Sequence, residues 1–490
     1  MLNVECFLSN GKQFAEEIIR TLRGRGHQAY LAGGCVRDLL LSREPADYDV
    51  ATDAAPQQVM QIFPQTYAVG EQFGVVLVPF KADTTKGTKE HKGGERTRRD
   101  PFEGRVVPGA MGGSGKQSYL FFPPPVRKSV EVATFRSDVG YSDGRHPDEV
   151  RFTKDPRQDV ERRDFTINGM MLDPASNEIL DFVGGRADLS AGIIRAIGDP
   201  ERRFAEDKLR MLRAVRFAAR FAYQIEPDTL AAIQKLASKI HQVSAERVRE
   251  ELTKMLTEGH ARRAFQWLDT TGLLQQVLPE IAAMKGVEQP PQYHPEGDVF
   301  VHTLLLLDKL PTGSSKTLAW GALLHDVGKP PTFRAAPDRI RFDGHVDVGV
   351  KMAAEILRRL RFSNDDTDQI LALVDHHMRF GQVQQMNQST LKKFLRLPSF
   401  DEHLELHRID CLSSHGQLDA YEFSLEQLRA ISPEEIRPTP LVTGRDLIEA
   451  GYEPGPRFKE ILGAVEDGQL DGRLTSRDSA MEYVRREFPA

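Results

Sequence analysis

Three carboxylates in the first third of the chain have the types and spacing of a metal site for phosphoryl transfer. Asp47 and Asp49 alternate in the segment ADYDVAT, and residues two apart on a β-strand face the same side. Two carboxylates side by side repel each other unless a divalent cation neutralises them. Glu131, in the alternating segment SVEVATF, supplies a third. Three carboxylates on adjacent strands could hold two Mg²⁺ ions about 4 Å apart, which activate a hydroxyl and stabilise a leaving pyrophosphate. In the alternative interpretation, Asp47 and Asp49 are turn residues after Pro45.

Two glycines lie upstream of these aspartates. Gly33 and Gly34 follow an expected strand, Ala29–Ala32, and precede an expected helix, Val36–Leu41. Glycine lets the backbone approach a phosphate closely and turn its N–H groups toward it. A glycine pair alone is weak evidence for a phosphate site, and it gains weight here from the carboxylates beside it.

Acidic and basic side chains alternate at the start of the clearest predicted helix, Glu206–Arg220. Asp207 and Arg210 are three residues apart, and Glu206 and Arg210 are four apart, so all three can share one helical face. A carboxylate accepts hydrogen bonds and a guanidinium donates them, so an Asp–Arg pair could match the edge of cytosine or adenine. The alternative is an ordinary surface ion pair, worth less than about 1 kcal/mol.

Histidines and aspartates recur in the apolar second half of the chain. His325 and Asp326 are adjacent within the segment ALLHDVGKP, where two polar side chains are unfavourable without a ligand. Imidazole suits transition metals and carboxylate suits Mg²⁺, so the pattern predicts a divalent metal site.

The apolar patterning of the chain places these residues on an α/β first third and a helical remainder. Besides the elements above, the expected helices and strands of the first third are Lys12–Arg23, Tyr48–Ala51, Gln57–Phe63, Gly74–Phe80 and Ser129–Phe135. Helices are expected from Asp199 onward, among them Ala245–Leu256, Ala261–Leu268, a region from Val299 to about Ala430, and a tail, Thr443–Glu487. Residues 81–128 are rich in Gly, Lys and Arg and have no apolar period, so we expect a mobile basic insertion, either a solvated loop or an RNA contact.

The composition limits the class of protein. A length of 490 residues suggests about three domains, and 40% hydrophobic with 28% charged residues fits a folded chain. We expect no membrane segment and no secretory signal, and three scattered cysteines favour a cytoplasmic location. A net charge of -6 excludes a globally basic nucleic-acid binder but permits a local basic surface.

The segment Leu31–Thr52 resembles the head of class II tRNA nucleotidyltransferases (CCA-adding enzymes) and bacterial poly(A) polymerases. Further segments match that family in the same order: Arg162–Pro174, Asp181–Leu189, Ile194–Phe204, Glu206–Phe221 and Ser244–Leu256. The resemblance implies an α+β head with a polymerase-β-like mixed sheet over residues 1–190 and a helical neck over 191–275. It also implies an HD-type helical body over 276–432 and a helical tail over 433–490.

By this resemblance, the chain adds CMP and AMP from CTP and ATP to the 3′ end of tRNA without a nucleic-acid template. Asp47, Asp49 and Glu131 are then the catalytic residues and bind Mg²⁺. Asp207 and Arg210 select the nucleotide, and Glu206 orients Arg210. The full set of implied nucleotide-binding residues is Gly33, Gly34, Arg37, Asp164, Asn168, Glu206, Asp207, Arg210 and Arg213.

The order of histidines and aspartates resembles the HD phosphohydrolase superfamily. The metal ligands that this resemblance implies are His302, His325, Asp326 and Asp410, with His345 and His376 available for a second metal or a phosphate. In some CCA-adding enzymes the HD domain hydrolyses 2′,3′-cyclic phosphates, 2′-nucleotides or other phosphoesters, and in others it is degenerate.

Several alternatives remain open at this stage. A poly(A) polymerase and an enzyme that adds only A or only CC use the same head, and the loop Asp138–Pro147 lies where the family switches from C to A. A different class is an HD phosphohydrolase whose head only binds RNA, and a third is a non-catalytic RNA-binding protein. The tail is expected to support tRNA.

Overall fold

The computed structural model describes residues 10–68, 74–80, 129–139, 149–292, 294–337 and 339–489. The predicted insertion at 81–128 and most of the loop Asp138–Pro147 lie outside these residues. The chain divides into two compact units, which we describe separately. One comprises residues 1–140 and 147–187, and the other comprises 141–146 and 188–490.

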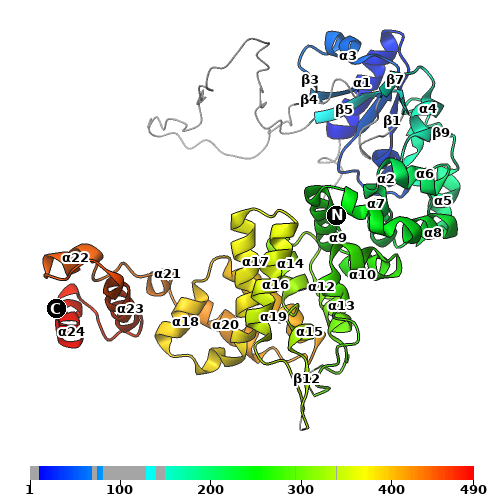
Figure 1. Ribbon diagram of the computed structural model, residues 1–490. Coiled ribbons are helices and arrows are strands. Elements are labelled where there is room, and N and C mark those ends of the chain that lie inside the picture. The colour runs from blue at the N-terminus through cyan, green and yellow to red at the C-terminus, as the bar shows by residue number, and fades with distance from the viewer. Residues whose placement is uncertain are drawn as a thin grey trace, which may run out of the picture. The chain divides into compact units, whose positions relative to one another are not determined.

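The first unit is built on a mixed seven-stranded sheet (Figure 1). The strands, in spatial order, are β3 (Tyr67–Ala68), β4 (Val75–Pro79), β5 (Ser129–Thr134), β2 (Asp49–Thr52), β1 (Ala29–Ala32), β8 (Met170–Leu172) and β9 (Ile179–Asp181). Only β2 and β5 run parallel, and the other neighbours are antiparallel. The strands expected in the first third are therefore present, each within a residue or two of its expected bounds.

Alternation of side chains gives strand β5 one buried face and one exposed face. On β5, Val130, Val132 and Thr134 are buried whereas Glu131 is exposed, so one strand supplies both a core face and a polar face. Helices α1 (Asn10–Gly24) and α3 (Pro56–Ile62) pack on one side of the sheet.

Shorter elements complete the first unit. They are α2 (Gly34–Leu40), α4 (Pro156–Glu161), a 3-10 turn (Thr166–Asn168), α5 (Gly185–Ala191, which crosses into the second unit) and the hairpin β6–β7 (Arg136–Val139 and Glu149–Phe152). The 3-10 turn and α2 lie beside each other, which brings the glycine turn close to the segment after α4.

The second unit is almost entirely helical. Its first part, the neck, contains α6 (Pro200–Glu206), α7 (Leu209–Phe221), α8 (Pro227–Leu236), α9 (Ala245–Thr257), α10 (Ala261–Thr270), α11 (Leu273–Val277) and α12 (Pro279–Ala282), with a two-stranded pair, β10–β11 (Ile193–Ile194 and Gln224–Ile225).

The expected continuous helix Glu206–Arg220 is wrong at its start. Glu206 ends α6, and Asp207 has an extended backbone (φ -144°, ψ 108°), so α7 begins only at Leu209. Asp207 accepts a hydrogen bond from the Leu209 N–H (3.0 Å), which satisfies one of the unpaired donors at the start of α7. Spacing alone does not reveal this break, because the apolar period continues across it.

The second part of this unit is the HD body, followed by a tail (Figure 1). The body contains α13 (Val299–Lys309), α14 (Lys316–Leu324), α15 (Lys329–Thr332), the hairpin β12–β13 (Arg334–Ala335 and Ile340–Arg341), α16 (His345–Arg359), α17 (Asn364–His376), a 3-10 stretch (His377–Gln385), α18 (Gln388–Leu395), α19 (Phe400–Ser413) and α20 (Asp419–Ala430). The tail contains α21 (Pro433–Ile436), α22 (Gly444–Glu449), α23 (Pro456–Leu470) and α24 (Arg477–Glu487).

Helix α14 lies at the centre of the body. All of its residues from Leu318 to Leu324 are buried, including the fully enclosed Trp320. The indole N–H of Trp320 donates to Thr253 Oγ1 of α9 (3.0 Å), which ties the body to the neck. This buried helix places His325 and Asp326, directly after its end, in the interior of the domain. Among the described residues, no helix is both long and apolar enough to span a bilayer.

Candidate active sites

The three predicted catalytic carboxylates of the head come together at the start of two parallel strands. Asp49 begins β2, and its register partner on β5 is Glu131. Asp47 lies two residues before β2, in an exposed bend rather than on the strand, and it acts electrostatically on both other carboxylates. The pairing of β2 with β5 therefore sets Asp49 beside Glu131, whereas the expectation that Asp47 and Asp49 share one strand is wrong for Asp47.

Crowding of negative charge shifts the protonation of this group. Burial, reinforced by repulsion from Glu131 and Asp47 and opposed by Arg163, raises the pKa of Asp49 to about 6. Burial and Asp47 also raise the pKa of Glu131. A divalent cation would relieve the same repulsion, so the donor set fits a hard metal ion such as Mg²⁺.

The turn at Gly33 requires glycine for two reasons. Its φ of 77° lies in the left-handed region, and a Cβ there would be 2.7 Å from an Arg163 guanidinium nitrogen. The Gly33 N–H donates to the Met170 carbonyl (3.1 Å), so this amide joins the turn to β8. Gly34 begins α2, whose first amides have no acceptor within the helix.

A buried polar network joins α2 to the 3-10 turn. Arg37 Nη1 donates to Asn168 Oδ1 (2.6 Å), and Asn168 Nδ2 donates to Asp164 Oδ1 (3.1 Å). Arg37 also binds its neighbour Asp38 (2.8 Å from Nε to Oδ1). These four side chains are at most 9% exposed, so they brace the glycine turn. The predicted contacts of Arg37, Asp164 and Asn168 with nucleotide stay predictions.

Arg163 is a site residue that the sequence reasoning missed. The buried carboxylate of Asp159 holds both Arg162 (2.7 Å) and Arg163 (3.0 Å). Burial alone would raise the pKa of Asp159, but the two guanidinium groups lower it. Asp159 thus fixes Arg163 beside Gly33, within electrostatic reach of Asp49. The available signal was its place next to Asp164 in the motif RRDFTING.

The predicted base-reading residues of the neck occupy the break between α6 and α7. Glu206 Oε2 accepts hydrogen bonds from Arg210 (2.8 Å) and from Arg203 (2.9 Å), so the expected Glu206–Arg210 contact is present. Asp207 instead pairs with Arg247 of α9 (2.8 Å).

Arg213 lies one turn beyond Arg210 on α7. Its guanidinium carbon is 5.3 Å from the centre of the Phe217 ring on the same helix. The predicted role of Arg213 in triphosphate binding stays a prediction.

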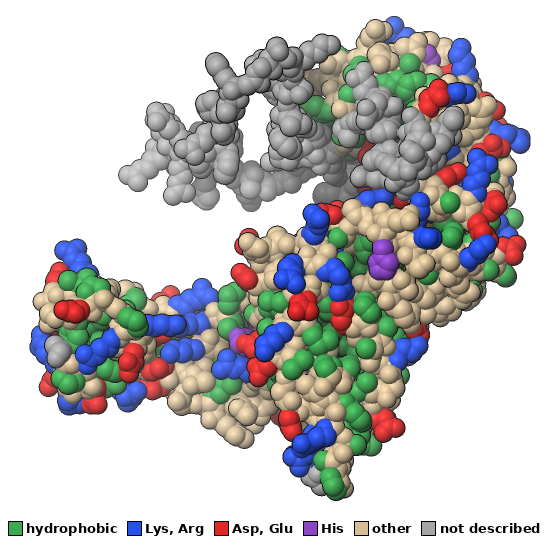
Figure 2. Space-filling model, in the orientation of Figure 1, with side chains coloured by type: hydrophobic (Ala, Val, Ile, Leu, Met, Phe, Trp, Pro, Cys, Tyr) green, Lys and Arg blue, Asp and Glu red, His purple; other side chains and the backbone are tan. Residues whose placement is uncertain are grey.

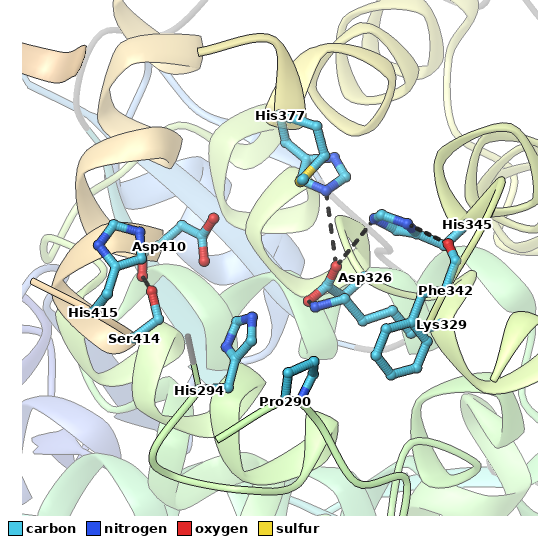
Figure 3. Close-up of a pocket in the computed structure, with 11 residues that line it drawn as sticks. Pro290, His294, Asp326, Lys329, Phe342, His345, His377, Asp410, Ser414 and His415 are labelled. Atoms are coloured by element: carbon cyan, nitrogen blue, oxygen red, sulfur yellow. Dashed lines mark hydrogen bonds and ion pairs between the residues drawn. The ribbon is translucent and has the colours of Figure 1, made fainter. Parts of the chain in front are cut away.

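The HD residues lie together at α13, at the end of α14 and on α19, and Figure 3 shows Asp326 and Asp410 of this group. His302 of α13 has its Nε2 3.1 Å from Asp410 Oδ1 of α19 and 3.9 Å from Asp326 Oδ2. His325 Nε2 is 3.2 Å from Asp326 Oδ2. The four ligands that the HD resemblance implies are therefore adjacent.

A second triad forms on the other oxygen of Asp326. His345, the first residue of α16, and His377 each place Nε2 3.8 Å from Asp326 Oδ1. The predicted His345 is thus brought to the cluster, whereas His376 is not. His376 Nδ1 lies 3.0 Å from its neighbour Asp375, and its ring faces His403 instead.

Hydrogen bonds orient these imidazoles toward a shared centre. His325, His345 and His377 use Nδ1 on the backbone carbonyls of Ala322, Phe342 and Val374, respectively. His302 uses Nδ1 on Glu296 Oε1 (2.7 Å). Within the described part of the chain, the buried Nε2 atoms of all four histidines meet no hydrogen-bond geometry. Metal-binding histidines are typically held in this way through the other ring nitrogen, so the donor set fits a divalent metal.

Burial and neighbouring charges shift the pKa values of several residues in the HD cluster. Burial lowers the pKa of His302, but the carboxylates of Asp410 and Glu296 outweigh it and raise the pKa to about 9. Burial and repulsion from His325 lower the pKa of His377 to about 4, which keeps its Nε2 available as a ligand. Burial would raise the pKa of Asp326, yet His325 and Lys329 hold it well below its usual range.

Glu296 and His294 were missed by the sequence reasoning, because they lie before the expected helical region that starts at Val299 and belong to none of its motifs. Glu296 Oε1 is shared by His302 (2.7 Å) and His294 (2.9 Å). The cluster opens into a cavity of about 350 Å³, whose walls include His294, Lys329, Phe342, Met378 and His415. A substrate could therefore reach Asp326 and Asp410 from one side.

Comparisons with known proteins identify the family of the chain. Three family models match the chain: the poly A polymerase head domain (residues 29–101 and 115–195), the probable RNA and SrmB-binding site of polymerase A (222–285) and the HD domain (298–407). The CCA-adding enzyme of Geobacillus sp. (strain WCH70) is 30% identical over 466 residues, which cover 94% of this chain and 93% of that protein. The chain belongs to the CCA-adding enzyme family. That of Bacillus subtilis (strain 168) is 27% identical over 468 residues and covers 95% of both chains.

Solved structures of CCA-adding enzymes share the fold. The Bacillus stearothermophilus enzyme in complex with CTP matches with a TM-score of 0.69 and 25% identity over 98% of both chains. The Thermotoga maritima enzyme complexed with tRNA matches with a TM-score of 0.54 and 17% identity over 98% of this chain and 96% of that one, which bears on the fold alone. The family resemblance and the fold class predicted from the motifs are confirmed. CCA-adding enzymes are tRNA nucleotidyltransferases, and this chain is an enzyme of that class.

Proposed function

We propose that this chain adds CMP and AMP, taken from CTP and ATP, to the 3′ end of tRNA, with Asp47, Asp49 and Glu131 as its catalytic carboxylates. The observation that carries the assignment is the register of β2 against β5, which sets Asp49 beside Glu131. The raised pKa of both carboxylates supports a cation as their partner. Its identity as Mg²⁺ and a cytoplasmic location are parts of the same proposal.

The reaction is a displacement at the α-phosphorus of the nucleotide. The 3′ oxygen of tRNA bonds to phosphorus, the bond to pyrophosphate breaks, and the hydroxyl proton passes to solvent. Mg²⁺ bound by the carboxylates would supply charge stabilisation of the reacting phosphate and of the leaving pyrophosphate. Asp49 must be ionised for this role, and Arg163 favours its ionised form. The rest of catalysis is positioning.

Nucleotide choice is assigned to the neck. Glu206 holds Arg210 as a donor, and Arg247 holds Asp207 as an acceptor, so both polar groups that face a base are fixed by a partner. Asp207→Ala and Arg247→Ala should each lower the preference for CTP and ATP over UTP and GTP before they affect folding. The ratio of kcat/KM values measures this, with the exposed neck residue Lys239→Ala as the control. Unchanged preference in both variants would contradict the role.

An incorporation assay tests the main proposal. Purified protein receives tRNA that lacks its 3′ end, Mg²⁺, and CTP, ATP or both, and the products are resolved at single nucleotides. Addition of C, C and A followed by a stop is expected. A growing ladder with ATP alone would identify a poly(A) polymerase, and addition of only A or only CC would identify a partial enzyme. Asp49→Asn should abolish incorporation while tRNA binding stays within about threefold of wild type. Glu178→Gln, an exposed carboxylate of the head, serves as the control.

A second activity is supported by the HD cluster. The buried Nε2 atoms around Asp326 favour a metal-dependent phosphohydrolase, with His302, His325, Asp326 and Asp410 as ligands and His345 and His377 facing the other oxygen of Asp326. A bound divalent metal would supply a nucleophilic water at neutral pH. In the hydrolysis, a water oxygen bonds to phosphorus, the ester oxygen leaves, and it takes a proton that the water releases through solvent.

The HD proposal has its own test. Wild-type protein, supplemented in turn with Mn²⁺, Co²⁺, Ni²⁺ or Zn²⁺, should hydrolyse bis(p-nitrophenyl) phosphate. Asp326→Asn should lose this activity and most of the bound metal, as measured by mass spectrometry of metal content, while it keeps incorporation within about twofold. Equal hydrolysis by Asp326→Asn would overturn the assignment.

A further inference from the structure

A short hairpin projects from the HD body (Figure 1). It consists of β12 (Arg334–Ala335) and β13 (Ile340–Arg341), and we call the described residues 333–337 and 339–342 the HD hairpin. Its last residue, Phe342, lines the cavity, and the Phe342 carbonyl oxygen accepts from Nδ1 of His345 (3.0 Å). The base of the hairpin is therefore part of the HD site itself.

The HD hairpin combines positive charge with aromatic surface. It carries Arg334, Arg339 and Arg341, and Figure 2 shows Lys and Arg side chains gathered on this projection. At its base, the Phe333 and Phe342 rings lie 6.0 Å apart. Phe333 is 42% exposed, which is unusual for so large an apolar side chain. Guanidinium groups interleaved with exposed aromatic rings are typical of surfaces that bind single-stranded nucleic acid.

Arg334 and Arg339 have exposed side chains that a phosphate can reach, whereas Arg341 is half-buried. Arg334 lies 3.8 Å from Asp343, directly after the hairpin, and both side chains are mostly exposed (66% and 76%). Such a long, solvated pair is weak, so a phosphate can replace the carboxylate. Met378 also lines the cavity and is 56% exposed, which adds apolar surface.

The volume of the HD cavity limits how much of a nucleic-acid strand can enter it. Its volume of about 350 Å³ is near the lower end for ligand pockets, so it holds a terminal group rather than a chain of nucleotides. The nucleotides that precede the end of a strand must lie outside the cavity, and the base of the HD hairpin, at Phe342, borders the cavity.

We propose that the HD hairpin is a docking surface for single-stranded RNA and directs the terminal phosphoester of the strand into the HD cavity. The inference rests on the proposed phosphohydrolase activity and adds its substrate class, which is an RNA end rather than a free mononucleotide. Arg334 and Arg339 contact backbone phosphates, and Phe333 stacks on a base.

The test compares two substrates with the same reacting group. One is a hexanucleotide RNA that ends in a 2′,3′-cyclic phosphate, and the other is the corresponding cyclic mononucleotide. Wild-type protein should prefer the hexanucleotide at least tenfold in kcat/KM. This preference should fall about five- to tenfold in R334A/R339A and about fivefold in Phe333→Ala. The control R358A/R429A also removes two exposed arginines of the HD body but none from the hairpin, and its preference should match wild type.

A readout without catalysis accompanies the kinetics. A hexanucleotide with 4-thiouridine near its end is photo-crosslinked to the full chain, and the crosslinked peptides are identified by mass spectrometry. Peptides that contain residues 333–342 are expected. Absence of those peptides, together with hydrolysis of both substrates at a ratio that R334A/R339A leaves unchanged, would overturn RNA docking at the HD hairpin. Failure of wild-type protein to hydrolyse either substrate with any metal would instead overturn the phosphohydrolase assignment, and the crosslink would then decide the docking surface alone.

Discussion

At the scale of single residues, Asp49 links the protonation of the head to its metal. The pKa of Asp49 is about 6 in the folded protein and about 4 in an unfolded chain. Without metal, folding therefore favours the protonated form, so this contribution to stability is full below pH 4 and is lost as the pH rises through 6. A bound cation reverses the preference, because it requires the ionised carboxylate.

We expect the affinity of the head for Mg²⁺ to decrease as the pH is lowered. Below pH 6, each unit of pH should weaken Mg²⁺ binding by up to about tenfold, since binding then displaces one proton. Isothermal titration calorimetry of the metal-free protein between pH 5 and 8 measures this, and buffers of different ionisation enthalpy report the released proton. Glu178→Gln should behave as wild type. A constant affinity between pH 5 and 7 would show that Asp49 is not the coupled group.

Gly33 is a second residue whose local geometry makes a sharp prediction. Gly33→Ala should destabilise the head by at least about 1–2 kcal/mol, because alanine is strained at a φ of 77° and its Cβ would displace Arg163. The change should also lower incorporation, since Arg163 lies near Asp49. Gly24→Ala, at an exposed helix end with nothing within 4 Å of the added Cβ, is the matched control. Thermal unfolding and incorporation rates measure both effects, and equal behaviour of the two variants would contradict the role of the turn.

The sequence predicted many of the residues that form the two sites, but it did not predict which side chains hold them in place. It placed Asp49 and Glu131 on neighbouring strands, which the structure confirms, but it also expected Asp47 to alternate with Asp49 on one strand, whereas Asp47 lies in a bend before β2. It chose His376 over His377, since adjacent residues differ by about 100° around a helix and only packing decides which one faces the cluster. Arg163 and Glu296 act through other side chains, and such supporting roles have no spacing rule.

At the scale of elements, a buried ion pair joins α7 to α9. Arg216 Nε donates to Glu251 Oε2 (2.7 Å), and both side chains are almost fully buried. Removal of Glu251 leaves the buried Arg216 with only a longer contact to Glu258 (3.6 Å), and breaking a buried pair by removing one partner typically costs about 3–5 kcal/mol. Glu251→Ala should therefore strongly destabilise the neck, whereas replacing both residues by apolar ones, R216M/E251L, should be nearly neutral.

Intrinsic fluorescence measures this prediction. The two tryptophans of the chain, Trp267 in α10 and Trp320 in α14, both lie in the second unit, so urea unfolding followed by fluorescence reports on it. Lys239→Ala on the neck surface is the control. A midpoint for Glu251→Ala equal to that of wild type would show that the pair contributes no net stability.

The bounds of helices and strands could be predicted where apolar residues recur at a regular spacing without interruption. The strand Ala29–Ala32 and the helices α9 and α10 match their predicted bounds within two residues, because one buried face runs through each. The break between α6 and α7 was missed, since it depends on the backbone of one residue, Asp207, and on its partner Arg247. The small hairpins β6–β7 and β12–β13 were missed too, because two to four residues carry too little periodicity.

At the scale of the whole molecule, the order of parts was predictable from motifs, but the way the tail joins the HD body was not. The tail has its own core, with Leu447, Ile461 and Val484 fully buried, and the end of the body has another around Phe380 and Phe394. Between these cores, charged groups meet. Lys393 of α18 binds Asp467 of α23 (2.6 Å), and Arg396 binds Glu466 (2.7 Å).

This junction should respond to charge without loss of either core. Partly exposed ion pairs contribute roughly 0.2–1 kcal/mol each, so the reversal E466K/D467K should loosen the tail about tenfold while the tail itself stays folded. The Ser389 N–H, which donates to Asp471 Oδ1 across the junction (2.8 Å), is the reporter. Its hydrogen exchange should become about tenfold faster, whereas amides at Ile461 and Val484 keep their protection. The exposed reversal E453K/E460K controls for net charge. Because salt screens the same pairs, wild-type protein in 1 M NaCl should shift in the same direction. If neither E466K/D467K nor 1 M NaCl alters the hydrogen-exchange rate of the Ser389 amide, apolar packing rather than charge holds the tail to the body.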